Sequence, residues 1–134
     1  MFINLENQVA LVTGASRGIG QSIALSLGKQ KAYVIGTATT EDGAQKISTF
    51  LKEQNILGKG IKLDVNNNEA ILQTVDGIIK EHGDISILVN NAGITKDMLL
   101  MRMKEEEWDD VMSTNLKSIF RMSQALIRLS LIHI

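Results

Sequence analysis

The 134-residue sequence predicts an α/β domain built on a parallel, doubly wound sheet. The first observation is that short apolar runs alternate with segments whose apolar residues recur at helical spacing. The second is a glycine-rich turn that directly follows the first apolar run and opens the first helical segment. Because strands that alternate with helices are joined by helical crossovers, we expect these strands to lie parallel.

Four strands and four helices are expected along the chain. Right-handed crossovers place the strands in the order 3-2-1-4 and leave a cleft at the carboxyl ends of the first and fourth strands. This arrangement is the N-terminal half of a Rossmann-type sheet. The strands are expected over residues 9–12, 33–36, 60–64 and 85–89, and the helices over residues 18–30, 41–55, 68–82 and 106–127.

Each of the first three helices is predicted from its apolar spacing and from the residues at its ends. Thr39 or Thr40 is expected to cap the second helix, because a hydroxyl at that position accepts from a backbone amide of the first turn. Gly83 is expected to end the third helix in a left-handed turn. The apolar stripes are Ile19, Ile23, Ala24 and Leu27 in the first helix, Ala44, Ile47 and Leu51 in the second, and Ile71, Val75, Ile78 and Ile79 in the third.

The composition indicates one globular domain over residues 1–134. A hydrophobic content of 44%, a charged content of 22% and a net charge of −1 give no bias toward nucleic acid or membrane partners. The chain has no cysteine, no secretory leader pattern and no apolar run near the ~20 residues that span a bilayer. We therefore expect a cytoplasmic protein, and no His, Asp or Glu spacing predicts a metal site.

The turn after the first strand is the stretch most indicative of function. Gly14 permits a tight turn, Gly18 removes a side chain where a ligand would approach, and Gly20 lets the helix pack closely on the strand. The free amides and the positive dipole end of that helix would face an anion such as a diphosphate. An ordinary glycine-rich connection between a strand and a helix is the alternative interpretation.

The glycine spacing G-x-x-x-G-x-G resembles that of the short-chain dehydrogenase/reductase family. Three further stretches resemble the family in the expected order: Asp64-Val65 after the third strand, Asn90 to Gly93 after the fourth, and Asn115 in the final helix. The resemblance implies that Asp64 and Val65 hold an adenine and that the turn around Asn91 brackets the cofactor. It also implies a catalytic role for Asn115, which would organise a water of a proton relay.

The end of the second strand favours NADPH over NADH. An enzyme that binds NADH commonly has Asp or Glu there, whereas this strand continues into Thr37 and Thr39. Their hydroxyls and the guanidinium of Arg17 can donate to a 2′-phosphate that a carboxylate would repel. Glu41 and Asp42 are interpreted as first-turn acids of the second helix. The expected cofactor site comprises Gly14, Ala15, Ser16, Arg17, Gly18, Ile19, Gly20, Thr37, Thr39, Asp64, Val65, Asn91, Ala92, Gly93 and Ile94.

A narrower resemblance covers residues 5–126. The stretch 99–103, together with Trp108 and the motifs above, is similar to ketoreductases that act on 3-oxoacyl chains bound to acyl carrier protein. This implies NADPH-dependent reduction to (3R)-3-hydroxyacyl products in fatty acid biosynthesis, an acyl-carrier-protein-bound substrate as partner, and a homotetramer. A short-chain dehydrogenase for another alcohol or ketone, or a non-catalytic cofactor-binding module, remain alternatives.

The family's catalytic Ser and Tyr-x-x-x-Lys pattern is not found in the sequence. The single tyrosine, Tyr33, lies in the second strand, and Thr37 stands four residues after it. The chain therefore resembles the N-terminal half of a reductase, with last residues that depart from the family pattern. We expect it to be inactive and poorly folded on its own, because the strand at 85–89 lacks a partner and the stripe of Val111, Leu116, Ile119 and Phe120 lacks a cover.

Overall fold

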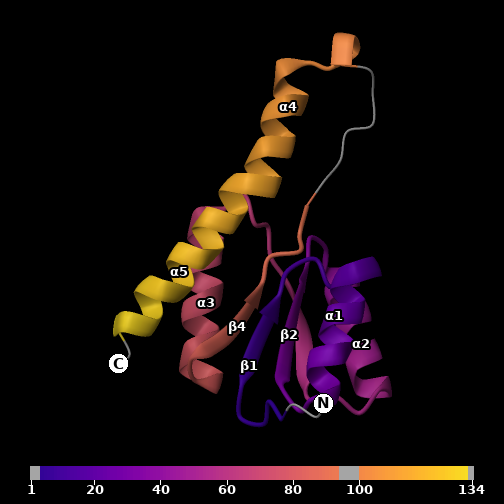
Figure 1. Ribbon diagram of the computed structural model, residues 1–134, viewed down its shortest axis with the longest axis vertical. Helices are drawn as coiled ribbons and strands as arrows, with labels where there is room; N and C mark the ends of the chain where they lie inside the picture. The colour runs from indigo at the N-terminus through magenta and orange to yellow at the C-terminus, as the bar shows by residue number, and fades with distance from the viewer. Residues whose placement is uncertain (1–3, 94–99, 133–134) are drawn as a thin grey trace.

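A computed structural model describes residues 4–93 and 100–132, which form a four-stranded parallel sheet with helices on both faces (Figure 1). The strand order β3-β2-β1-β4 confirms the predicted 3-2-1-4 arrangement. The α/β class and the N-terminal half of a Rossmann-type sheet are confirmed with it. The strands are β1 (Val9–Val12), β2 (Tyr33–Ala38), β3 (Gly58–Lys62) and β4 (Ile85–Val89).

Helices connect the strands as the sequence predicts, with differences at the third strand and in the last helix. The connecting helices are α1 (Gly18–Lys29), α2 (Glu41–Glu53) and α3 (Asn68–His82). A 3₁₀ turn (Leu100–Arg102) precedes α4 (Glu105–Met112), a π-helical segment (Ser113–Lys117) and α5 (Ser118–Ile132). The predicted single helix over 106–127 is therefore a longer helical run over 105–132 with a widened turn inside it.

The third strand begins two residues earlier than predicted because two glycines are required there. A Cβ on Gly58 would lie 2.0 Å from the carbonyl oxygen of Val34, and a Cβ on Gly60 would lie 2.1 Å from that of Ala44. The backbones of β2 and α2 thus approach β3 more closely than a side chain allows. Because glycine is in general unfavourable in strands, the sequence pattern gives no signal that the strand already begins at Gly58.

Alternating side chains of the sheet enter two separate cores. Val9 and Leu11 of β1 face α3 and α5, where they meet Val75 and Met122 in one buried cluster. Ala10, Val12 and Val34 face α1 and α2, where Ile47 and Leu51 are fully buried. Side chains of β1 thus contribute to both cores.

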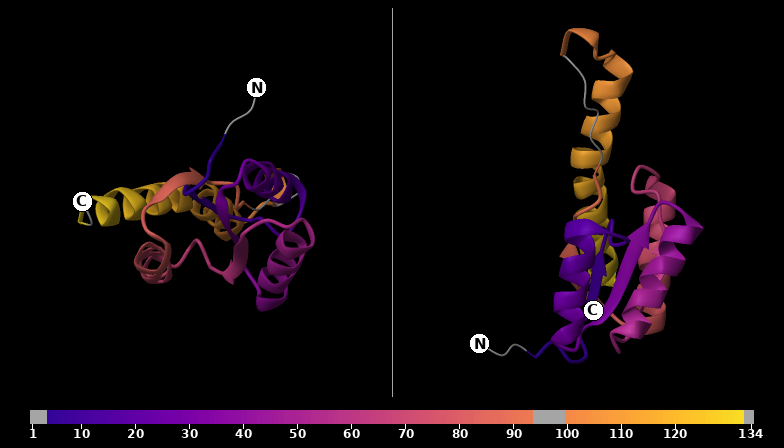
Figure 2. Two further views of the ribbon diagram at one scale, coloured as in Figure 1. Left: turned by 90° about the horizontal axis from the view of Figure 1, so that it is seen from below. Right: turned by 90° about the vertical axis from the view of Figure 1, so that its right-hand side faces the viewer.

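The α4 helix extends past the carboxyl edge of the sheet, in continuation of α5 (Figures 1 and 2). It has no buried residue. Leu116, Ile119 and Phe120 are exposed, as predicted, whereas Val111 is half-buried. β4 lies at one end of the sheet, and of its residues only Ile85 is buried. Within the described part of the chain, no helix has the length and apolarity needed to cross a membrane.

Candidate functional site

Thr13 ties the carboxyl ends of β1 and β4 together. Its side chain is buried, and its Oγ1 accepts hydrogen bonds from the backbone amides of Asn91 and Ala92, each at 3.0 Å. The same hydroxyl lies 3.3 Å from the carbonyl oxygen of Val89, to which it donates. The segment after β4 is therefore fixed against the glycine turn, even though nearly 80 residues of sequence separate them.

Gly14 and Gly20 are both required by close backbone contacts. Gly14 has φ +65, and a Cβ there would lie 3.0 Å from Cα of Ala92. A Cβ on Gly20 would lie 2.1 Å from the carbonyl oxygen of Gly14 and 2.5 Å from Nδ2 of Asn91. Asn91 Nδ2 donates to that carbonyl at 2.9 Å. The turn, the start of α1 and the segment after β4 are thus packed as one unit.

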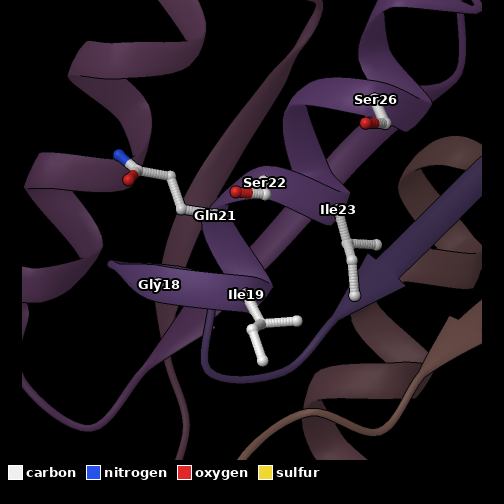
Figure 3. A pocket seen from close by; sticks show the side chains of 6 residues that line it. All are labelled: Gly18, Ile19, Gln21, Ser22, Ile23 and Ser26. Atoms are coloured by element: carbon white, nitrogen blue, oxygen red, sulfur yellow. The ribbon is translucent and has the colours of Figure 1, made fainter.

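Gly18 is required for its backbone conformation. Its φ is +62, but a Cβ there would meet nothing within 4 Å. The residue therefore opens onto empty space at the start of α1 (Figure 3). Ile19 and Ile23 project from the same side of α1 in this view, and Ile19 is 73% exposed.

The start of α1 lacks a side-chain cap, unlike the starts of α2 and α3. Thr40 accepts from the amide of Gly43 at the start of α2, and Asn67 accepts from the amide of Ala70 at the start of α3. At α1 the N-cap position is Arg17, whose side chain makes no capping bond, and the first turn holds no acid. The amides of this helix start are therefore open to an anion from outside the chain.

A hollow of about 510 Å³ lies over this helix start and reaches the ends of β2 and β3. Thr39, Asp64 and Val65 line its far side, and Asn66 and Thr114 complete the wall. Eleven of the residues predicted for the cofactor line it together: Gly14, Ser16, Arg17, Gly18, Ile19, Thr39, Asp64, Val65, Asn91, Ala92 and Gly93.

Three predicted residues lie behind the wall of this hollow. Thr37 is only 1% exposed, and its Oγ1 accepts from the amide of Gly14 at 3.3 Å, so the predicted direct contact with a 2′-phosphate is not supported. The buried Ala15 donates its amide to the carbonyl of Thr37 at 2.9 Å. Gly20 is buried below the turn. These residues shape the turn from behind, while Ile94 lies outside the described residues.

A second hollow of about 670 Å³ adjoins the first and contains Asn115. The two hollows share Arg17 and the residues Asn91 to Gly93. A Cβ on Gly93 would lie 2.9 Å from Oδ1 of Asn115, so the asparagine side chain stands directly against this glycine. Asn115 itself lies in the π-helical segment and is half-buried. The structure thus brings Asn115 next to the predicted cofactor residues.

The charged side chains on the first hollow are Arg17 and Asp64. Arg17 is shared with the second hollow, whereas Asp64 stands beyond the end of β3 and accepts from the amide of Asn66 at 2.9 Å. The described residues contain no group of three His, Cys, Asp or Glu side chains that could hold a metal ion. The site therefore offers an exposed cation and open helix amides for an anionic ligand.

Sequence reasoning missed Thr13, Asn66 and Thr114. Thr13 directly precedes the glycine turn, and a hydroxyl at the end of a central strand was the available signal. For Asn66 and Thr114 no such signal exists, because 47 residues separate them and only the folded chain brings them together.

Comparison with known proteins agrees with this geometry. The family model for short chain dehydrogenase matches residues 8–132. The chain belongs to this family. The glycine turn, the Asn-Asn-Ala-Gly stretch and the helix asparagine are thus arranged as parts of a short-chain dehydrogenase fold.

Within the family, the chain is similar to curated enzymes named 3-oxoacyl-acyl-carrier-protein reductase FabG. The identity is 60% to the protein of Vibrio cholerae, 54% to that of Escherichia coli and 53% to that of Pseudomonas aeruginosa. In each case the match covers 94% of this chain and 50% or 51% of the relative. The chain therefore spans about half the length of these relatives.

Proposed function

We propose that residues 1–134 form a single dinucleotide-binding domain, the N-terminal half of an NADPH-dependent 3-oxoacyl-acyl-carrier-protein reductase. The observation that carries this proposal is the uncapped start of α1, which opens onto a hollow that Asp64, Thr39 and Asn91 also line. The names of relatives that are 53–60% identical support the substrate class.

The residues fit a dinucleotide by shape and by charge. The close packing of Gly14 and Gly20 leaves the helix start unobstructed, and the space over Gly18 accepts a diphosphate against the open amides. Asp64 and Val65, which line the hollow, are proposed to hold the adenine, and the segment from Asn91 to Ile94 is proposed to bracket the cofactor. The cofactor would supply a hydride for reduction of a ketone.

The end of β2 supports a preference for the 2′-phosphate. Thr39 and Arg17 line the hollow, and no carboxylate follows Ala38 directly. Glu41 and Asp42 lie in the first turn of α2, which Thr40 caps, as the sequence predicts. We assign the 2′-phosphate contact to Arg17 and Thr39 and give Thr37 the role of positioning Gly14.

The proposed reaction adds a hydride to the C3 carbonyl carbon of a 3-oxoacyl thioester and a proton to its oxygen. Asn115 is proposed to orient a water of the proton relay that resupplies the proton donor, beside the second hollow. Tyr33 is unsuited to this role because it begins β2, at the edge of the sheet opposite the site, where its ring stacks on His82 at 4.3 Å. The proton donor and the carbonyl-polarising serine are thus proposed to lie outside these 134 residues.

The proposal extends to the location, the assembly and the partner of the enzyme. We propose a cytoplasmic homotetramer whose substrate partner is an acyl-carrier-protein-bound 3-oxoacyl chain. The exposed Leu116, Ile119 and Phe120 are compatible with burial by further protein.

A chimera tests the function. Residues 1–126 are joined to the second half of the Vibrio cholerae relative, and oxidation of NADPH is followed with acetoacetyl thioester. We expect turnover with NADPH, much slower turnover with NADH, and little turnover with simple ketones that lack the thioester. Equal rates with unrelated ketones would assign another substrate class, and an inactive chimera that folds would contradict the proposal. The 134-residue chain alone is the control and should show no turnover.

A further inference from the structure

Asn66 makes four hydrogen bonds, three of them to the helical run that carries Asn115. It follows Asp64 and Val65 in the segment after β3, and it lines the first hollow. Its side chain reaches the π-helical segment, 47 and 48 residues further along the chain. Each of the four polar groups of Asn66 has its own partner.

On one side, the amide of Asn66 donates to Oδ1 of Asp64 at 2.9 Å. On the other side, its Nδ2 donates to Oγ1 of Thr114 at 2.8 Å, and its Oδ1 accepts from Oγ of Ser113 at 3.0 Å. Its carbonyl oxygen accepts from Nη1 of Arg121 at 2.9 Å. Asn66 thus bonds to the helical run on both sides of Asn115.

The segment that receives these bonds is a π-helical turn, in which the chain takes one more residue per turn than in an α-helix. Such widened turns are rare, occur mostly as single turns inside α-helices and are frequent at functional sites. Thr114 is buried, and its carbonyl also accepts from the hydroxyl of Ser118. The contacts from Asn66 therefore help to set the position of Asn115, the next residue.

We propose that Asn66 is a positioning residue that couples occupancy of the adenine side of the cofactor hollow to the placement of Asn115. The inference rests on the function proposed above. A ligand that contacts Asp64 orders the segment from Asp64 to Asn66, and the two side-chain bonds of Asn66 carry this ordering to Ser113 and Thr114. The coupling needs no movement of the sheet, because every step is a direct hydrogen bond.

Splitting the cofactor into two pieces tests the coupling. In the chimera, reduced nicotinamide mononucleotide serves as hydride donor, with and without adenosine 2′,5′-bisphosphate, which fills only the adenine side. We expect the bisphosphate to raise kcat for the mononucleotide by about tenfold, a size typical of coupling between sites. In Asn66→Ala we expect an activation of less than about twofold. The ratio of kcat with the bisphosphate to kcat without it reports the coupling. A purely structural loss would lower both kcat values together and leave their ratio unchanged.

Three further variants complete the design. Asn66→Asp keeps the oxygen that accepts from Ser113 and replaces Nδ2 with a second oxygen, to which the Thr114 hydroxyl can donate in turn, so the activation should return. Asn67→Ala is the matched control: its side chain only caps α3, and its activation should stay at the wild-type value. If Asn66→Ala fails to fold, Thr114→Val removes one of the same bonds from the other side and should also reduce the activation.

The outcomes separate the coupling from the function. Activation of Asn66→Ala equal to that of the unmodified chimera would overturn the coupling, as would a lack of activation in an unmodified chimera that turns over NADPH. Failure of a folded chimera to turn over NADPH at all would overturn the proposed function, and the coupling with it. Loss of activation in Asn66→Ala, with activation kept in Asn67→Ala, supports the coupling.

Discussion

The sheet with its flanking helices and the helical arm α4 are stabilised in different ways. Ile47 and Leu51 of α2 are fully buried against the sheet, and Thr40 caps the helix. By contrast, α4 has no buried residue and no side-chain cap, although its sequence is also amphipathic. Amphipathic spacing therefore predicts a helix, but the neighbours of that helix decide whether its apolar face contributes to stability.

The candidate site spans both regions. The glycine turn, Thr39 and Asp64 belong to the sheet region, whereas Asn115 is carried by the helical run that leaves it. We expect the sheet region to govern cofactor binding and the helical run to govern turnover. We make four predictions, ordered from the largest expected effect to the smallest. The first three compare the sheet region with the helical run, and the last compares two positions at the end of α1.

The same substitution should have very different effects in the two regions. Leu51→Ala removes a fully buried side chain beside Ile47 and should lower the free energy of unfolding by about 2–5 kcal/mol. Leu116→Ala removes a side chain that is 54% exposed and should change it by less than about 0.5 kcal/mol. Urea unfolding followed by far-UV circular dichroism measures both values, with Leu51→Ala also made in the chimera because the 134-residue chain is expected to be poorly folded on its own. A comparable loss for both variants would mean that Leu116 is covered in solution, for instance by self-association.

Arg17 and Asn115 should separate binding from turnover in the chimera. Arg17→Ala should weaken NADPH by about 1.5–3 kcal/mol, because a charge-assisted bond to the 2′-phosphate is lost, and should affect NADH much less. Asn115→Ala should lower kcat and leave the Kd of NADPH nearly unchanged. Fluorescence titration with both cofactors and steady-state kinetics measure these effects. Equal weakening of NADPH and NADH by Arg17→Ala would exclude a contact of Arg17 with the 2′-phosphate.

The cap of α2 provides a smaller contrast with α4. Thr40→Ala removes the hydroxyl that accepts from the amide of Gly43 and should destabilise the chain by about 1 kcal/mol. Lys104→Ala changes the N-cap position of α4, where no side-chain bond is made, and should have little effect. Thermal unfolding of both variants checks this pair. An effect of Lys104→Ala as large as that of Thr40→Ala would show that α4 contributes to global stability.

The smallest expected effect is a gain in stability after α1. Lys31 has φ +77, a conformation that glycine adopts at little cost, and its amide donates to the carbonyl of Gly28 at 2.9 Å. Lys31→Gly should therefore stabilise the chain by up to about 1 kcal/mol. Lys29→Gly, within the last turn of α1, is the control and should destabilise it by a similar amount. A midpoint of urea unfolding that falls for Lys31→Gly would contradict the prediction.

The sequence by itself determined the strand order and the glycine turn, and it narrowed the cap of α2 to Thr39 or Thr40, of which the structure shows Thr40. These features depend on residues close together in sequence: the periods of the apolar residues, three glycines in seven positions and a threonine before a helix. It also predicted that most of the proposed cofactor residues lie on one edge, because the carboxyl ends of parallel strands share an edge.

Only the tertiary structure decided which side chains line the hollow at that edge and which are buried beneath the glycine turn. Thr37 lies within β2 and is buried beneath Gly14, whereas Thr39 lies one residue beyond the end of the strand and lines the hollow. The early start of β3 follows from backbone contacts of Gly58 and Gly60 with other segments. The bonds from Asn66 to the π-helical turn join residues 47 and 48 positions apart, so no local pattern encodes them. The close approach at Gly58 and Gly60 and the bonds from Asn66 form only when segments far apart in the sequence pack together. Packing depends on the shapes of all the packed segments at once, so a local sequence pattern does not predict these contacts.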